Sequence, residues 1–305
     1  MNTPSRPRAT KIICTIGPAT DTSDMLGQLI EAGANVFRLN MSHSKHDWVR
    51  EVVFRIRRKA AELEANVAIL FDLQGPSIRT GDLAEPYHLK KGDTVEIRLG
   101  TAKPELPFST TVNYDGLLQD VQAGHTMVVD NGGILMRIAE VRPDRLICDV
   151  LTEGVFGSRR HINLPGVALR LPALTEKDLA DLAVAVECET DYVAMSFVRD
   201  AAHIAQLREH IDNLGGKAQI VAKIEDQQAV RHIDDIILAA DVIMVARGDL
   251  GIEVSIEELP IIQRRIVRHC HRLGRRCIVA THMLESMITC LLYTSDAADD
   301  TPCVD

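Results

Sequence analysis

Short apolar runs alternate with longer amphipathic segments along the first part of the chain. An apolar run at residues 11–17 precedes a segment at 22–34 whose hydrophobic residues recur at helical spacing. The pattern repeats with an apolar run at 35–40, an amphipathic segment at 45–64 and an apolar run at 67–73. Alternation of this kind predicts parallel strands that are connected by helices.

The alternation stops between residues 81 and 165. Apolar and polar residues follow one another there in the manner of strands, and no long helical pattern is present. The sequence Asp130-Asn131-Gly132-Gly133 stands between two apolar segments and predicts a β-hairpin. We therefore expect an all-β domain at 81–165, inserted into the α/β domain.

The α/β pattern resumes after Pro165. Thr175 and Asp178 have the spacing of a helix-capping pair, which predicts a helix that ends near Glu189. Later helices are predicted at 201–214, 227–240 and 260–274, and later strands at 191–197, 219–225, 241–249 and 276–284. The expected fold class is therefore α/β, a (β/α)8 TIM-type barrel that is incomplete, with seven of its eight strands.

Composition and charge exclude several functional classes. Hydrophobic residues make up 46% of the chain and aromatic residues only 4%, so Val, Ile, Leu and Ala must fill the core, as in buried parallel sheets. The formal net charge of −9 argues against a nucleic-acid partner, and no apolar run is long enough to predict a membrane span. The seven cysteines show no CxxC spacing, so we expect neither disulfides nor zinc, and a cytoplasmic location.

Polar residues stand at the predicted carboxyl ends of the strands, where barrel enzymes place their active sites. Lys223 and Glu225 share one face of a strand, and Asp249 ends the neighbouring strand. Two carboxylates with water form a common Mg²⁺ site, and a lysine beside Mg²⁺ neutralises the charge of a transferring phosphoryl group. Taken alone, Lys223 and Glu225 also fit a local ion pair.

Two further groups of polar residues carry weaker signals. Arg38, Asn40 and Ser42 occupy every second position, and arginine suits a phosphate. Asn40, Ser42 and Asp72 offer oxygen atoms to a monovalent cation, although each also fits a capping or loop role. The glycine-flanked turn at 246–251 could bind an anion through its backbone N–H groups, or be an ordinary turn.

Several long segments resemble the motifs of pyruvate kinases, in family order, from Thr10 to Ile288. They are TKIICTIGPAT, AGANVFRLNMSH, LFDLQGPSIRTG, INLPGV, LPALTEKDLADL, AKIEDQQAV, DVIMVARGDLGIE and ATHMLESMI. The resemblance implies phosphoryl transfer from phosphoenolpyruvate to ADP, giving pyruvate and ATP in glycolysis. It also implies Mg²⁺ or Mn²⁺ and K⁺ as cofactors, a homotetrameric parent enzyme, and an inserted domain that acts as a mobile lid over the nucleotide.

The same resemblance implies a role for each matching residue. Lys223 would stabilise the transferring phosphoryl group, Arg38 would bind substrate phosphate, and Thr281 would lie where the enolate is protonated. The carboxylate of phosphoenolpyruvate would bind the backbone N–H groups of Gly248 and Asp249 and the Thr281 hydroxyl. The implied ligands are Glu225 and Asp249 for Mg²⁺, Asn40, Ser42, Asp72 and the Leu73 carbonyl for K⁺, and Asn40, His43, Arg79 and Arg160 for the nucleotide.

The chain departs from the family pattern in places. Leu73-Gln74 stands where many members have threonine and lysine, which removes a charge, and Arg159-Arg160 replaces paired lysines. We divide the chain into barrel strands one to three at 1–80, the lid at 81–165 and barrel strands four to seven at 166–288. Periodicity ends at 289–305, where CLLYTSDAAD resembles a translated sequencing adapter, so we expect a non-native, disordered tail.

Two alternative functions stay open on the sequence alone. The chain could be an inactive truncated fragment, or another phosphoenolpyruvate/pyruvate-barrel enzyme, such as a lyase or an aldolase. The allosteric effector, the oligomeric state of this chain and the strictness of its K⁺ dependence do not follow from the sequence.

Overall fold

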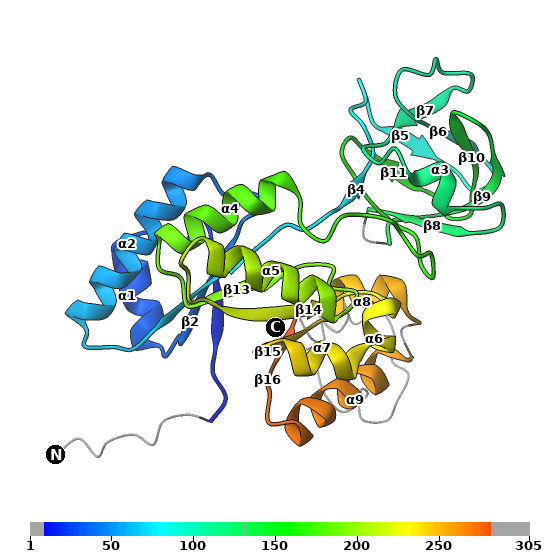
Figure 1. Ribbon diagram of the computed structural model, residues 1–305. Coiled ribbons are helices and arrows are strands. Elements are labelled where there is room, and N and C mark those ends of the chain that lie inside the picture. The colour runs from blue at the N-terminus through cyan, green and yellow to red at the C-terminus, as the bar shows by residue number, and fades with distance from the viewer. Residues whose placement is uncertain (1–8, 131, 256, 282–305) are drawn as a thin grey trace, which may run out of the picture.

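A seven-stranded parallel sheet forms the larger lobe of the computed structural model, which describes residues 9–130, 132–255 and 257–281 (Figure 1). In spatial order its strands are β1 (Ile13–Ile16), β2 (Val36–Asn40), β3 (Ala68–Asp72), β13 (Tyr192–Met195), β14 (Gln219–Ile224), β15 (Val242–Ala246) and β16 (Arg276–Ala280). Every neighbouring pair runs parallel. The expected fold class, an incomplete parallel barrel, is confirmed.

Helices follow the strands along the chain. They are α1 (Ser23–Glu31), α2 (His46–Glu62), α4 (Glu176–Glu187), α5 (Ala201–Asn213), α6 (Gln227–Arg231), α7 (Ile233–Ala239), α8 (Arg247–Glu253) and α9 (Leu259–Arg272). The helix predicted at 227–240 divides at His232, whose φ and ψ of −98° and 21° interrupt the helical path. The strand predicted at 241–249 ends at Ala246, and its last three residues begin α8 instead.

The core of this lobe has two layers, which explains the nearly continuous apolar strands. Phe37 and Phe71 are fully buried in the cluster that packs against the helices. The alternate position Leu70 faces the other side of the sheet, where it meets Val221 and Met244. Successive strand residues point to opposite faces, so a strand covered on both faces needs apolar side chains at nearly every position.

The inserted residues form a separate, mainly antiparallel lobe (Figure 1). Its larger sheet contains, in spatial order, β4 (Ile78–Arg79), β12 (His161–Asn163), β8 (Thr126–Val129), β9 (Ile134–Val141), β10 (Arg145–Val150), β6 (Thr94–Arg98) and β7 (Phe108–Thr111). A second ribbon pairs β5 (Tyr87–Leu89) with β11 (Gly154–Phe156), and α3 (Leu117–Asp120) is a single short helix. The β8–β9 hairpin predicted around Gly132-Gly133 is present, with Val129 opposite Ile134.

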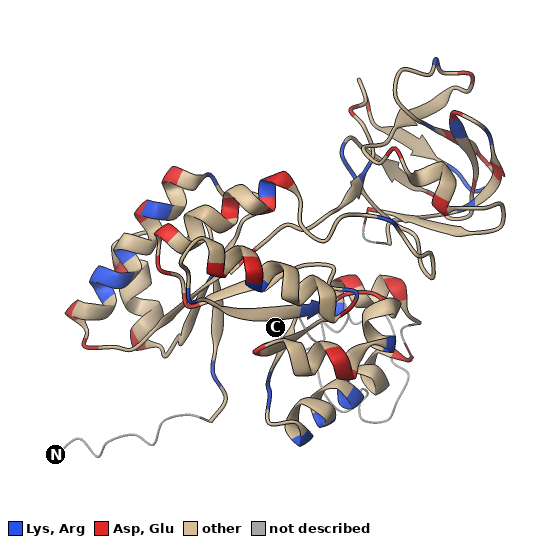
Figure 2. Ribbon diagram, in the orientation of Figure 1, with Lys and Arg blue, Asp and Glu red and all other residues tan. Residues whose placement is uncertain are grey.

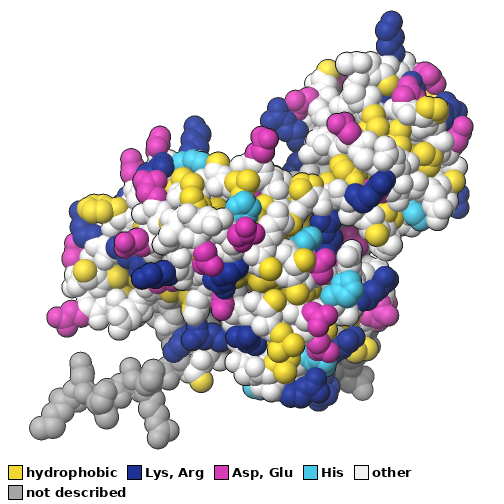
Figure 3. Space-filling view, viewed as in Figure 1, with side chains coloured by type: hydrophobic (Ala, Val, Ile, Leu, Met, Phe, Trp, Pro, Cys, Tyr) yellow, Lys and Arg dark blue, Asp and Glu magenta, His cyan; other side chains and the backbone are white. Residues whose placement is uncertain are grey.

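Two short strands of the inserted lobe's larger sheet lie where the chain enters and leaves that lobe. β4 leads into the inserted lobe and β12 leads out of it, and they pair antiparallel, with Arg79 opposite His161 and Ile78 opposite Ile162. Figure 3 shows an indentation of the molecular outline where the lobes meet. The chain therefore enters and leaves the inserted lobe at one place, beside the carboxyl ends of the barrel strands.

The surface and the ends of the described chain add three observations. Lys and Arg residues are interspersed with Asp and Glu on the helices in Figure 2, without a large basic face in that view. Within the described ranges, every helix is too short or too polar to cross a membrane. The tail predicted at 289–305, and the part of the last predicted strand beyond Thr281, lie outside the described residues.

Candidate active site

A cavity of about 470 Å³ lies between the carboxyl ends of the barrel strands and the inserted lobe. It brings together most of the residues predicted from the sequence: Arg38, Asn40, Ser42, His43, Asp72, Leu73, Arg79, Arg160, Lys223, Glu225 and Asp249. The barrel residues come from the ends of β2, β3, β14 and β15, and the two later arginines come from the inserted lobe. Residues that are far apart in the sequence thus line the same cavity.

Gly248 and Thr281 are not among the residues that line this cavity. They meet at the ends of β15 and β16, where the Gly248 N–H donates a hydrogen bond of 3.0 Å to Oγ1 of Thr281. The guanidinium of Arg247 donates to the carbonyl oxygens of Ala280 (2.9 Å) and Thr281 (2.5 Å). This arrangement holds the Thr281 backbone in the left-handed region, at a φ of 75°.

The Lys223 ammonium is the centre of the polar network. Its Nζ lies 2.8 Å from Oε1 of Glu225 and 3.2 Å from Oδ1 of Asp72, and it donates a 2.7 Å hydrogen bond to Oγ of Ser196. Burial opposes the charge on this ammonium, but the Glu225 and Asp72 carboxylates outweigh burial and raise the pKa of Lys223 above its ordinary value. The lysine is therefore a fixed cation at neutral pH.

Each oxygen of the Glu225 carboxylate has one partner in the protein. Its Oε2 accepts a 2.6 Å hydrogen bond from the Phe197 N–H, and its Oε1 faces Lys223. Burial raises the pKa of Glu225; Lys223 opposes that rise, and the charge of Asp249 adds to it. A further cation between Glu225 and Asp249 would relieve the repulsion between these two carboxylates, so the donor set fits a divalent metal ion.

Among the described residues, no three His, Cys, Asp or Glu side chains gather as a complete metal cluster. A divalent ion bound by Glu225 and Asp249 would therefore take its other ligands from water or substrate. That division suits Mg²⁺, which dehydrates reluctantly and keeps several waters.

Asp72 lies between two cations. Nε of Arg38 donates to Oδ2 of Asp72 over 2.7 Å, and Nη1 of Arg38 donates to Oγ1 of Thr15 over 2.9 Å. Oδ1 of Asp72 is buried and accepts no hydrogen bond, because its 3.2 Å approach to Lys223 lacks hydrogen-bond geometry. An oxygen of this kind is a natural ligand for a cation.

Two of the other oxygens predicted for K⁺, those of Asn40 and Leu73, each accept one hydrogen bond from a side chain or backbone group. Oδ1 of Asn40 accepts from the Ser42 N–H over 3.1 Å, and the Leu73 carbonyl accepts from Oγ of Ser196 over 2.8 Å. A carbonyl oxygen has two lone pairs, so one hydrogen bond leaves room for a cation contact. The residues present fit a monovalent ion.

Guanidinium groups line the side of the cavity formed by the inserted lobe. Arg79 donates through Nη1 to the Arg159 carbonyl over 3.1 Å, and Nη1 of Arg160 lies 3.2 Å from Oδ1 of Asp130. Burial lowers the pKa of His161; the charge of Asp249 opposes this effect and that of Arg79 adds to it. The lowered pKa favours the neutral form of His161. The positive charge on this side of the cavity therefore comes from Arg79 and Arg160.

Several residues that shape the site carried little or no signal in the sequence. Ser196 joins Lys223 to the Leu73 carbonyl, and its place at a strand end was its only signal. Phe197 adopts a left-handed φ of 55°, a conformation that is uncommon for residues other than glycine and that the sequence does not predict. Asp178 was recognised only as a helix cap, yet its Oδ1 also accepts from the Gly75 N–H over 3.0 Å. Such contacts depend on tertiary structure.

Comparison with known proteins gives a consistent result. The family model described as pyruvate kinase, barrel domain, matches residues 7–300. Plastidial pyruvate kinase 2 of Arabidopsis thaliana is 41% identical over 288 residues, which cover 93% of this chain and 49% of that protein. Pyruvate kinase of Clostridium perfringens is 40% identical over 281 residues, covering 92% of this chain and 59% of the relative. The chain thus spans about half the length of these relatives.

Proposed function

Because the chain belongs to the pyruvate kinase family, we propose that it transfers a phosphoryl group from phosphoenolpyruvate to ADP. The observation that carries this proposal is the position of Lys223. Its ammonium lies within 3.2 Å of two carboxylates, and across the same cavity lie the guanidinium groups of Arg79 and Arg160. A group with several negative oxygens fits between such walls.

In this reaction the bond from phosphorus to the enolate oxygen breaks, and a bond from phosphorus to a β-phosphate oxygen of ADP forms. Charge spreads over the phosphoryl oxygens in the transition state. Lys223, which its carboxylate neighbours keep protonated, is placed to stabilise that charge. Arg38, whose orientation Asp72 and Thr15 fix, would bind the phosphate of the substrate.

Glu225 and Asp249 would hold Mg²⁺ or Mn²⁺, and Asn40, Ser42, Asp72 and the Leu73 carbonyl would hold K⁺. These ions would add positive charge near the phosphoryl oxygens to that of Lys223 and Arg38. The protein would contribute by holding the ligand oxygens in position. The Phe197 N–H orients Glu225, and Ser196 orients the Leu73 carbonyl.

The other end of phosphoenolpyruvate would bind near α8. Its carboxylate would accept hydrogen bonds from the N–H groups of Gly248 and Asp249, the first of which now donates to Thr281. The Thr281 hydroxyl would then be free to contact the substrate, and a proton held there would reach the enolate carbon to give pyruvate. The inserted lobe, with Arg79, Arg160 and His43 nearby, would cover the nucleotide and exclude water.

An assay of ATP formation from phosphoenolpyruvate and ADP, with Mg²⁺ and K⁺ present, tests the proposal. Lys223→Met should reduce kcat by at least about a hundredfold, because the transition state loses a buried cation. Lys217→Met is the matched control, since Lys217 is exposed beside the start of the same strand. ATP formation that survives Lys223→Met would contradict the proposed role. No ATP from the wild-type chain would favour the inactive fragment, and pyruvate release without ADP would favour a lyase or aldolase.

A further inference from the structure

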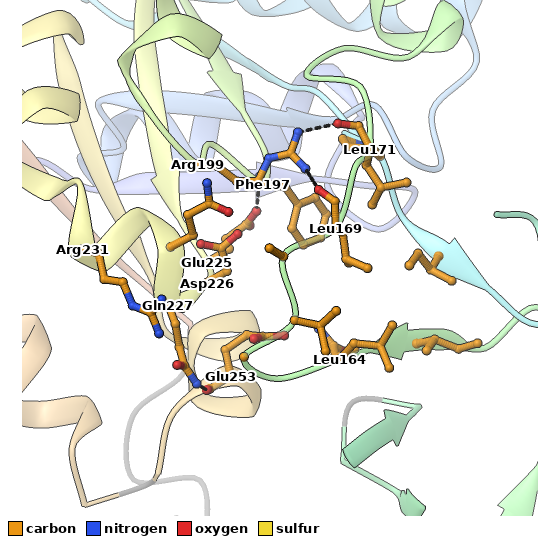
Figure 4. A pocket seen from close by; sticks show the side chains of 18 of the residues that line it. Leu164, Leu169, Leu171, Phe197, Arg199, Glu225, Asp226, Gln227, Arg231 and Glu253 are labelled. Carbon is orange, nitrogen blue, oxygen red and sulfur yellow. Dashed lines mark hydrogen bonds between the residues drawn. The ribbon is translucent and has the colours of Figure 1, made fainter. Parts of the chain in front are cut away.

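Ligand atoms of a metal site are held in position by protein groups that lie behind them. In the candidate active site, the Phe197 N–H holds Oε2 of Glu225 in this way (Figure 4). Asn40, at the end of β2, and Ser42, two residues later, offer oxygens to a monovalent ion and require comparable support. The structure provides that support from Lys177 of α4, a residue that the proposed reaction does not otherwise use.

Lys177 reaches the turn after β2 from outside the catalytic cavity. Its Nζ donates a hydrogen bond of 2.7 Å to the Met41 carbonyl, across 136 residues of sequence. Met41 is completely buried, so bulk water cannot take the place of the ammonium group at this carbonyl. Lys177 and Met41 are not among the residues that line the catalytic cavity. The lysine therefore acts on the site through the backbone.

The Met41 carbonyl and the Ser42 N–H belong to one planar peptide group and point in opposite directions. The Ser42 N–H donates to Oδ1 of Asn40 over 3.1 Å. Lys177 thus fixes one end of this peptide group, and Asn40 lies at the other end. A rotation of the peptide group would move the backbone of Ser42 and break the hydrogen bond that orients the Asn40 amide. Two of the predicted ligands for the ion therefore depend on the same contact.

A buried carboxylate holds the Lys177 ammonium in place. Oδ2 of Asp181, one turn later in α4, lies 2.6 Å from Nζ of Lys177. Oδ1 of Asp181 lies 2.7 Å from Nε2 of His46, at the start of α2. Asp181 is completely buried, and a buried carboxylate requires partners this close. The same carboxylate balances the charge of Lys177, so the contact with Met41 adds little net positive charge beside a cation site.

We propose that Lys177 is a positioning residue for the monovalent cation. Through the Met41–Ser42 peptide group it holds Asn40 and Ser42 in the orientation that binds the ion. The inference rests on the proposed function, which assigns K⁺ to these oxygens, and it deepens that function. In the alternative, Lys177 only stabilises α4 through its ion pair with Asp181, four residues later. The two roles differ in their effect on the affinity for K⁺.

The affinity for K⁺ can be measured without any enzyme assay. Thermal unfolding of the full chain is followed while KCl replaces tetramethylammonium chloride at constant ionic strength. K⁺ that binds the folded chain raises the unfolding midpoint, and the dependence of this rise on K⁺ concentration gives the dissociation constant. We expect Lys177→Met to raise the dissociation constant at least about tenfold, which corresponds to about 1.4 kcal/mol.

Further variants separate positioning of the ion ligands from support of the helix. Arg50→Met removes the ion pair between Arg50 and Glu187, which joins the same helices α2 and α4 without touching Met41. Its dissociation constant for K⁺ should stay within about twofold of the wild-type value. Lys177→Arg keeps a charged donor and should bind K⁺ within about threefold of wild type. If Lys177→Met does not fold, the double variant with Asp181→Asn leaves no buried carboxylate unpaired and should show the same loss.

The ATP-formation assay gives a second measurement. Lys177→Met should raise the K⁺ concentration needed for half-maximal activity, while kcat at saturating K⁺ stays within about threefold of wild type. Equal dissociation constants for K⁺ in wild type, Lys177→Met and Arg50→Met overturn the inference. A wild-type chain that does not bind K⁺ also overturns it, although ATP formation by that chain would still support the proposed function. Binding of K⁺ that depends on Lys177 in a chain that forms no ATP would contradict the proposed function alone.

Discussion

The backbone N–H of Gly75 donates a hydrogen bond to Oδ1 of Asp178 across 103 residues of sequence, over 3.0 Å. Asp178 is completely buried, and its Oδ2 accepts from the N–H (2.8 Å) and the Oγ1 (2.6 Å) of Thr175. One carboxylate thus joins the start of α4 to the turn after β3. That turn carries Leu73 into the active site and leads to the first strand of the inserted lobe.

Asp178→Asn tests this connection. The amide keeps the shape of the side chain but can accept hydrogen bonds at only one of its two end atoms. At least one buried donor at Gly75 or Thr175 loses its partner, so we expect the free energy of unfolding to fall by about 1–3 kcal/mol. Urea denaturation measures the change, with Asp212→Asn on the exposed end of α5 as the control. Equal stabilities for the two variants would argue against a structural role for Asp178.

Gly75→Ala tests the packing of the same turn. The residue has a φ of 70°, and a Cβ there would lie 2.9 Å from Cβ of Ser196. Gly92 is the matched control, because its φ is 93° and nothing lies within 4 Å of the position of a Cβ. Both substitutions place alanine in a left-handed backbone conformation, which destabilises each variant. A difference between their free energies of unfolding therefore measures the effect of the contact with Ser196.

We expect Gly75→Ala to destabilise the chain by at least about 1 kcal/mol more than Gly92→Ala. It should also lower kcat, because Ser196 donates to the Leu73 carbonyl and accepts from Lys223. Urea denaturation and the ATP-formation assay give the two measurements. Indistinguishable effects of the two alanines would mean that the turn relaxes without moving Ser196.

Glu225→Gln tests the two-carboxylate metal site. The change keeps the size of the side chain and removes one of the two charges that would bind the divalent ion. We expect the Mg²⁺ concentration needed for half-maximal ATP formation to rise at least about tenfold, with Glu257→Gln on the surface as the control. A lower kcat with an unchanged Mg²⁺ requirement would assign Glu225 to the orientation of Lys223 alone.

Glu253→Gln should change how stability depends on pH. Burial, with a smaller effect from the charge of Asp226, raises the pKa of Glu253 to about 7; hydrogen bonds from Asn163 and the Gly166 N–H oppose the rise. The ordinary value is 4.5, so between 4.5 and about 7 the folded chain retains a proton that the unfolded chain releases. The stability that Glu253 contributes is complete below pH 4.5 and declines as pH rises through 7.

Glutamine does not titrate, so the variant lacks this decline. We expect Glu253→Gln to gain about 1–2 kcal/mol relative to wild type between pH 5 and pH 8. Urea denaturation of both chains at the two pH values measures this gain. A stability difference that stays constant with pH would show that the Glu253 carboxyl ionises at its ordinary pKa.

The fold was predictable because apolar strands and amphipathic helices follow rules that act over a few residues. The capping pair Thr175 and Asp178 and the hairpin at Gly132-Gly133 are signals of this local kind. The break at His232 was not predictable, because apolar residues continue through α7 and only the backbone angles change. Sequence patterns over a few residues determine where helices and strands form. Tertiary contacts determine the residues at which these helices and strands end.

The candidate site was predictable to the extent that strand ends converge in a barrel. Side chains two apart, such as Lys223 and Glu225, could be placed on one face from the sequence alone. The contact of Arg38 with Asp72, 34 residues away, follows from the parallel register of β2 and β3, in which Asn40 lies opposite Asp72. The left-handed Phe197 and the contact of Lys177 with the Met41 carbonyl depend on packing that the pattern of apolar residues does not reveal.

The pairing of β4 with β12 has a consequence for how the nucleotide would be held. Because β12 also pairs with β8, this two-stranded ribbon is part of the inserted lobe's own sheet and would move with the lobe as one body. Its internal sheet and core are already ordered, so a movement of the lobe toward the barrel would not require the ordering of a long loop. Arg79, in β4, and Arg160, just before β12, would therefore move with the lobe and approach the phosphates together.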